Sequence, residues 1–333
     1  MTILNLAPLF YFQYIPSNDG PSHVYNSAML RAFILSPSSP ARTIFVLNSS
    51  IPPNLLTHSF MAVAMSFFKP VTAERLLVVL YAVLLPLGFR YFLRSVSLRT
   101  SGLEYFSLVW VYNSHLHWGF YNFLFSIILF LFSLGYWIRR REQLSGRAVA
   151  VLALLITLLY FCHPVGLFEF WIASLAMMTF QWKRTREFRR GLALFTAAAA
   201  PAGILYVHYA LTKIAVATPE ITTWPTLRYS ASLLFTFSPL ATYWPIQRVI
   251  AASVLFILCA GFICATQLRE LERSINEFFV AACVCAALVF LAPTSTGGGT
   301  MLTPRLVYFP IVLSCAWLAR LNWKVDPGKS LAV

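Results

Sequence analysis

The 333-residue chain is strongly apolar: 59% of its residues are hydrophobic and only 11% are charged. A soluble domain carries about 25% charged residues, so this composition excludes a water-soluble globular protein. The net charge of +14 does not indicate a nucleic-acid partner, because the basic residues flank apolar segments, as the positive-inside rule expects. We therefore predict an all-α, polytopic integral membrane protein that forms one transmembrane domain over residues 1–333.

The N-terminal part alternates short apolar segments with polar loops. Residues 3–14 form a first apolar segment, and a polar loop at residues 16–23 follows it. Residues 23–35 are predicted to form an amphipathic helix at the membrane interface. Residues 51–68 are apolar but begin with two prolines, so we interpret them as a half-span or re-entrant element, which is tolerated where protein covers its backbone.

The rest of the chain contains clearer apolar spans near the roughly 20 residues needed to cross a bilayer. We predict spans at residues 71–92, 123–138, 148–162, 165–180, 191–211, 249–265, 278–291 and 306–318. Counting shorter segments, the prediction is about ten crossings plus one half-span. The long stretch 212–247 is predicted to be a loop. The six cysteines all fall in apolar segments and are interpreted as small core residues.

Charge placement predicts the orientation. If the basic clusters at residues 90–99, 139–147, 183–190, 269–273 and 320–329 are cytoplasmic, the spans alternate without conflict only when residues 51–68 do not cross. This places the N-terminus in the cytoplasm, the six histidines in or near the outer half, and the protein in a membrane such as the bacterial inner membrane.

Asp19 is the leading candidate for chemistry, since it is one of only 11 acidic residues and lies in the first outer loop. A carboxylate there could be a general base, and an Asp-Gly turn is the simpler alternative. His23 lies one helical turn further on, so both side chains could share a site.

The second outer loop offers Asn113, His115 and His117 as substrate-binding candidates. Two histidines separated by one residue can chelate a metal if the backbone is extended, but they point apart in a helix. An aromatic belt at the membrane interface is the structural alternative. We predict no metal site and no bound cofactor.

Three further positions are substrate-binding candidates. His163 precedes a proline between two spans, and Arg305 follows a glycine-rich loop at residues 294–304 and opens the last span. Arginine can bind phosphate bidentately, and Arg228 in the long outer stretch could join it. Glu169 is an acidic residue inside a span, which makes it a functional candidate.

The order of the N-terminal elements resembles the GT-C superfamily of polytopic glycosyltransferases, which includes protein O-mannosyltransferases and aminoarabinose transferases. The resemblance covers residues 1–180 and depends on the first-loop Asp19, the interfacial helix, the proline-containing half-element and the sequence Thr72-Ala73-Glu74-Arg75-Leu76-Leu77. Residues 181–333 would then be variable C-terminal helices.

The resemblance implies that Asp19 is the catalytic base and that a sugar moves from a polyprenyl-phosphate donor to an acceptor on the outer face. It also implies membrane lipid and a lipid-linked sugar as partners. The second outer loop has Asn113, His115 and His117 where many members have another acid. The alternatives are a transporter or lipid flippase, or a non-catalytic component of an envelope polysaccharide assembly system.

Overall fold

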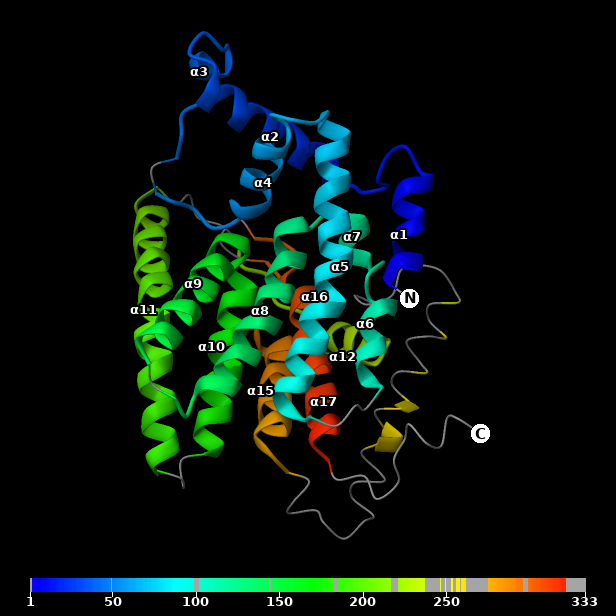
Figure 1. Ribbon diagram of the computed structural model, residues 1–333, viewed down its shortest axis with the longest axis vertical. Coiled ribbons are helices and arrows are strands. Elements are labelled where there is room, and N and C mark those ends of the chain that lie inside the picture. Colours follow the sequence, from blue (N-terminus) through cyan, green and yellow to red (C-terminus); the bar gives the residue numbers. More distant parts are fainter. Residues whose placement is uncertain are drawn as a thin grey trace.

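The computed structural model describes residues 2–48, 50–98, 102–143, 145–181, 185–216, 221–236, 275–295 and 299–321, with isolated positions between 246 and 261. Within these residues the regular elements are helical, apart from one isolated bridge between Thr223 and Ser295. The helices form a bundle with a smaller group of helices over one of its ends (Figure 1).

The smaller group comes from the N-terminal part of the chain. It consists of α2 (Gly20–Leu35), α3 (Ala41–Ile44) and α4 (Leu56–Ala64), and α1 (Thr2–Tyr11) lies beside the bundle. α4 has nine residues, about 14 Å at 1.5 Å per residue, so it cannot cross a hydrocarbon core of about 30 Å. The prediction of a non-crossing element at residues 51–68 therefore agrees with the structure.

Seven helices of the described residues make up the bundle. They are α5 (Pro70–Val96), α8 (Tyr121–Arg140), α9 (Gly146–Cys162), α10 (Pro164–Phe180), α11 (Thr185–Val216), α15 (Glu277–Leu291) and α17 (Tyr308–Arg320). The helix α5 packs on α8, α8 on α9 and α10, α10 on α15, and α15 on α17. The local sequence explains where two of these helices begin. Pro70 and Pro164 occupy first-turn positions of α5 and α10, where the backbone N–H that proline lacks is not needed.

The helices α8 and α17 form the centre of the bundle, and α11 lies at its edge. We compare the most apolar 18-residue stretch of each helix. In this stretch 78% of the residues are buried in α8, 89% in the segment that contains α17, and 28% in α11. A helix that is apolar all round belongs in a core or against lipid. The exposed apolar side chains of α11 are therefore expected to contact lipid.

Four helices in the described residues are long and apolar enough to cross a membrane: Pro70–Val96, Tyr121–Arg140, Phe188–Lys213 and Leu302–Arg320. The apolar helices α9, α10 and α15 are shorter, with 15 to 17 residues. The predicted count of about ten crossings is not confirmed. Most of the predicted span at residues 249–265 lies outside the described residues.

The two ends of the bundle differ in chemistry. At one end, Arg139 Nε donates to Ser95 Oγ at 2.8 Å, Arg320 Nη1 donates to the Val96 carbonyl at 3.1 Å, and Arg141 pairs with Glu277 at 3.0 Å. We call this the arginine end. The opposite end carries α2, α4 and the connections before α8 and α10, and we call it the loop end (Figure 1).

Two connections are more helical than the sequence suggested. The predicted long loop contains α12 (Leu227–Thr236), whose Ser230 donates to the Val289 carbonyl of α15 at 2.7 Å. The connection between α5 and α8 contains α7 (Ser114–Trp118), preceded by η1 (Leu103–Tyr105) and α6 (Phe106–Val109). A further short helix, α16 (Leu302–Leu306), carries Arg305 just before α17. Of the six cysteines predicted to be core residues, Cys259 and Cys283 are exposed, and Cys264 lies outside the described residues.

Candidate functional site

The loop that carries Asp19 is held against the end of α7 by backbone hydrogen bonds. The amides of Asn18 and Asp19 donate to the carbonyls of His117 and Trp118 at 2.8 and 3.1 Å. Gly119 ends α7 with φ +78°, and a Cβ on it would lie 2.7 Å from the Gly20 nitrogen. Only glycine allows both this backbone conformation and this approach. The Asp19 loop and the segment that contains α7 therefore form one joined structure.

The carboxylate of Asp19 is not used to cap α2, although Asp19 occupies the N-cap position. An N-cap aspartate usually accepts a hydrogen bond from the first turn of the helix, and here no such side-chain bond exists. Its Oδ1 instead accepts from Asn18 Nδ2 at 3.0 Å, and the side chain is half-buried. If Asp19 served only as a turn residue, most of the hydrogen-bonding capacity of its carboxylate would remain unused.

Side chains of α5 and α8 support the loop from beneath. Tyr121 donates to Glu74 Oε1 at 2.5 Å, and its oxygen lies 3.0 Å from Ser17 Oγ. A Cβ on Gly20 would collide with all three side chains. Arg75 Nη2 donates to the carbonyls of residues 12 and 13, at 2.9 and 2.7 Å. Glu74 and Arg75, which are adjacent near the start of α5, thus hold the two ends of the segment that leads to Asp19.

His23 and His58 form a hydrogen-bonded pair between α2 and α4. His23 Nδ1 lies 2.9 Å from His58 Nε2, and His58 Nδ1 lies 2.9 Å from the Asn54 carbonyl. Asn122 also donates to this carbonyl at 2.9 Å. Burial and then the neighbouring His58 lower the pKa of His23 to about 4, and burial lowers the pKa of His58. Both imidazoles are therefore neutral at pH 7.

His163 and Arg305 meet at the point where α10 begins. His163 Nδ1 accepts from the Val165 amide at 3.1 Å, which caps α10. Arg305 Nη1 lies 3.3 Å from His163 Nε2. Burial, and then the charge of Arg305, hold the pKa of His163 well below its usual range, so the ring is neutral at pH 7.

These contacts place more donors than acceptors around His163. A neutral imidazole has one acceptor nitrogen, and guanidinium has only donors. Because Nδ1 of His163 accepts from the Val165 amide, its Nε2 carries the proton and faces Arg305 Nη1. Arg305 Nε is also buried with no hydrogen-bond partner among the described residues. The pair therefore presents several N–H groups from which an anion could accept hydrogen bonds.

Aromatic rings and the Asp19 carboxylate complete the surroundings of Arg305. Its guanidinium carbon lies 4.3 Å from the centre of the Phe120 ring and 5.8 Å from that of Phe123. Asp19 is near enough to interact electrostatically with both Arg305 and His23, although it is not within 4 Å of Arg305. We call Asp19, His23, His58, His163 and Arg305 the polar cluster.

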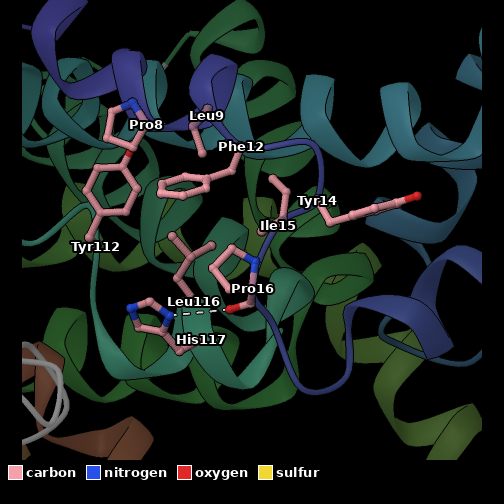
Figure 2. Close-up of a pocket in the computed structure, with 9 residues that line it drawn as sticks. All are labelled: Pro8, Leu9, Phe12, Tyr14, Ile15, Pro16, Tyr112, Leu116 and His117. Carbon is pink, nitrogen blue, oxygen red and sulfur yellow. Dashed lines mark hydrogen bonds between the residues drawn. The ribbon is translucent and has the colours of Figure 1, made fainter.

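The structure separates His115 from His117. Both lie on α7, whose backbone is helical, so their side chains point apart. His115 is buried against the rings of Phe123 and Tyr308, with centroids 5.1 and 5.3 Å away. His117 faces the other way, and its Nδ1 lies 3.4 Å from the Pro16 carbonyl (Figure 2). A metal chelate by these two residues is therefore excluded by the geometry.

His117 lines a pocket of about 170 Å³ between α1, α7 and the start of the Asp19 loop (Figure 2). The lining is almost entirely apolar: Pro8, Leu9, Phe12, Tyr14, Ile15, Pro16, Tyr112, Leu116 and His117. The volume is smaller than the roughly 300–1,000 Å³ of a pocket that encloses a whole small molecule. It therefore suits part of an apolar ligand.

Besides His115 and His117, three more predicted residues lie outside the polar cluster. Asn113 is fully buried and caps α7, and its Nδ2 donates to Tyr81 and to the Trp110 carbonyl, both at 2.8 Å. These bonds assign Asn113 a structural role. Arg228 is exposed on α12, and no described residue of the polar cluster bonds to it. Glu169 is buried in the second turn of α10, beside the thiol of Cys285.

Sequence reasoning left His58 out of the candidate site. Asn54 precedes α4 and has φ +68°, so its contact with His58 does not follow from helical spacing. The sequence places His58 inside the apolar segment at residues 51–68. The partner across the gap, His23, is 35 positions away, and no local pattern reports such a contact.

No protein-family model matches the chain, and no curated protein and no solved structure matches it significantly. The class of protein follows from the fold: the described residues form a helical bundle with four long apolar helices, which defines a helical membrane protein.

Proposed function

We propose that this protein is a membrane glycosyltransferase that moves a sugar from a polyprenyl-phosphate donor to an acceptor on the outer face of the membrane. One observation carries the proposal: the donors of Arg305 and His163 converge without enough acceptors, close to the uncommitted carboxylate of Asp19. Convergent donors suit a phosphate, and a carboxylate beside them suits a base.

The charges of the site fit this reaction. The acceptor oxygen bonds to the anomeric carbon while the bond from that carbon to the phosphate oxygen breaks. The electron pair leaves with the lipid phosphate, where Arg305 and His163 stabilise its charge, and the hydroxyl proton passes to Asp19. General-base catalysis of this kind contributes about 10²- to 10⁴-fold in rate.

The apolar pocket supports a lipid-linked substrate. Its lining includes residues 14–16, which lead into the Asp19 loop, and is almost entirely apolar (Figure 2). A branched hydrocarbon chain could enter it while the phosphate stays at the polar cluster. A free nucleotide sugar has no apolar part that would gain from this pocket.

The test is a transfer assay with purified protein in nanodiscs and a panel of sugars linked to polyprenyl phosphate. We expect transfer by the unchanged protein, and a KM for the donor about 10- to 100-fold higher in Arg305→Gln, because a hydrogen bond to a charged group contributes about 1.5–3 kcal/mol. Arg31→Gln is the matched control, since Arg31 is exposed on α2 at the same end. Absence of transfer from every donor, or an unchanged KM in Arg305→Gln, would contradict the proposal.

A further inference from the structure

Two arginines from different helices are held at the last turn of α5, which packs on both α8 and α17 (Figure 1). Arg139 of α8 donates from Nε to Ser95 Oγ at 2.8 Å, and its guanidinium carbon lies 4.5 Å from the centre of the Tyr91 ring. Arg320, the last residue of α17, donates from Nη1 to the Val96 carbonyl at 3.1 Å. Because Ser95 and Val96 are adjacent, both guanidinium groups lie beside the same turn of one helix.

The anchor of Arg139 is built into the contact between α5 and α8. Ser95 Oγ donates its only proton to the Tyr91 carbonyl at 2.8 Å, so it can only accept from Arg139. Gly135 of α8 lies against both α5 residues, since a Cβ on it would be 2.9 Å from Tyr91 Cε1 and 3.0 Å from Ser95 Oγ. Arg139 is therefore held in place before any ligand binds, which lowers the entropic cost of binding.

These contacts use only part of the donors of each arginine. A guanidinium group carries five N–H groups and no acceptor, and α5 engages one nitrogen of Arg139 and one of Arg320. Both side chains are exposed, and no carboxylate with a described side chain pairs with either of them. Capping of α5 would explain one bond from each arginine, but it leaves the other N–H groups and both charges uncompensated.

The outer face of α5 adds two cations and an apolar side chain. Arg90 and Arg94 are exposed and one turn apart, and Leu87, which is 50% exposed, lies one turn further toward the middle of the helix. Residues three or four positions apart lie on the same face of a helix. This face therefore has cations near the end of the helix and an apolar side chain deeper in the membrane. The same order of groups, an anion followed by hydrocarbon, occurs in a phospholipid.

We propose that the last turn of α5, with Arg94, Arg139 and Arg320, binds the headgroup of an anionic phospholipid. Basic pockets between transmembrane helices bind such headgroups, and guanidinium groups bind phosphate bidentately. The acyl chains then lie along the exposed face of α5 at Leu87. This site is at the arginine end, opposite the polar cluster, so it does not depend on the proposed transfer reaction.

The neighbouring arginines of α8 and its C-cap are engaged elsewhere. Arg141 pairs with Glu277 at 3.0 Å, and Arg140 Nη1 donates to Gln143 Oε1 at 2.7 Å, in the connection to α9. Neither of them bonds to α5 in the described part of the chain. Arg140 has the same charge as Arg139, is the next residue and is also exposed. It is therefore the matched control, because a purely electrostatic attraction to the membrane surface would involve both residues equally.

The test is native mass spectrometry of purified, delipidated protein titrated with phosphatidylglycerol or with phosphatidylcholine of the same acyl chains. We expect phosphatidylglycerol to bind about 10- to 100-fold more tightly, because several arginines near the phosphate attract a net negative headgroup. Equal affinity for the two lipids would overturn the proposal. Displacement by free glycerol phosphate at the same concentration as by the lipid would also overturn it, since the site would then take a soluble anion.

Variants separate a built site from overall charge. Arg139→Gln and Arg320→Gln should each weaken phosphatidylglycerol binding about 10- to 100-fold, whereas Arg140→Gln should weaken it less than about fivefold. Ser95→Ala keeps every charge but removes the anchor of Arg139, so it should weaken binding about 2- to 10-fold. It also tests the site if Arg139→Gln does not fold. An equal loss in Arg140→Gln and Arg139→Gln, or unchanged binding in Ser95→Ala, would contradict the proposal.

Discussion

At the scale of single residues, Gly119 joins the Asp19 loop to the end of α7 in the candidate site. Its φ of +78° and its 2.7 Å approach to the Gly20 nitrogen act together. A non-glycine residue with this conformation costs about 1–2 kcal/mol, and a Cβ would also push the Asp19 loop away from α7. The position of Asp19 thus depends on a residue with no side chain.

Gly102 provides a matched comparison, because it has a similar φ of +73° but nothing within 4 Å of the added Cβ. We expect Gly102→Ala to lower stability only by the conformational cost, about 1–2 kcal/mol. Gly119→Ala should lower it further, because the collision adds to that cost. Thermal unfolding in detergent measures both. Equal losses would show that the Asp19 loop does not press against Gly119.

At the scale of helices, the long apolar segments could be predicted from sequence. The predicted hairpin at residues 148–162 and 165–180 coincides closely with α9 and α10, because Pro164 and the His163 cap mark the boundary between them. The last span was predicted to begin at residue 306, whereas the structure has α16 and α17 separated at Val307. Apolar periodicity locates helices well, but it does not report such breaks.

The short helices and the contacts between them could not be predicted. The five-residue α7 depends on one cap bond, from the Leu116 amide to Asn113 Oδ1 at 3.0 Å, and an asparagine in a polar loop gives no unique indication of this. Asp19 and Arg305 could be nominated because charges are rare in this chain. That these two residues lie near each other could not be predicted, because it arises from the packing of helices far apart in sequence.

At the scale of the whole molecule, the arginine end and the loop end lie on opposite sides of the bundle (Figure 1). Basic residues near the ends of spans favour the cytoplasmic side, so the polar cluster is expected to face outward. This orientation is a requirement of the proposed function, because the acceptor is on the outer face.

Cysteine labelling of intact cells tests this orientation. In a background without the native cysteines, Asp19→Cys should react with a membrane-impermeant reagent added outside, and Arg140→Cys should react only after the membrane is opened. We expect this difference because Asp19 and Arg140 lie at opposite ends of the bundle. The opposite pattern would mean that the polar cluster faces the cytoplasm.

The effect of Asp19→Asn on sugar transfer is the most direct test of the central claim, that the Asp19 carboxylate serves as the base of a glycosyltransferase. The change keeps the size of the side chain and suits the same turn, but it removes the proton acceptor. Purified Asp19→Asn protein should fold normally and transfer sugar from its polyprenyl-phosphate donor about 10²- to 10⁴-fold more slowly. Transfer at the unchanged rate would contradict the account and leave the Asp19 loop with a structural role only.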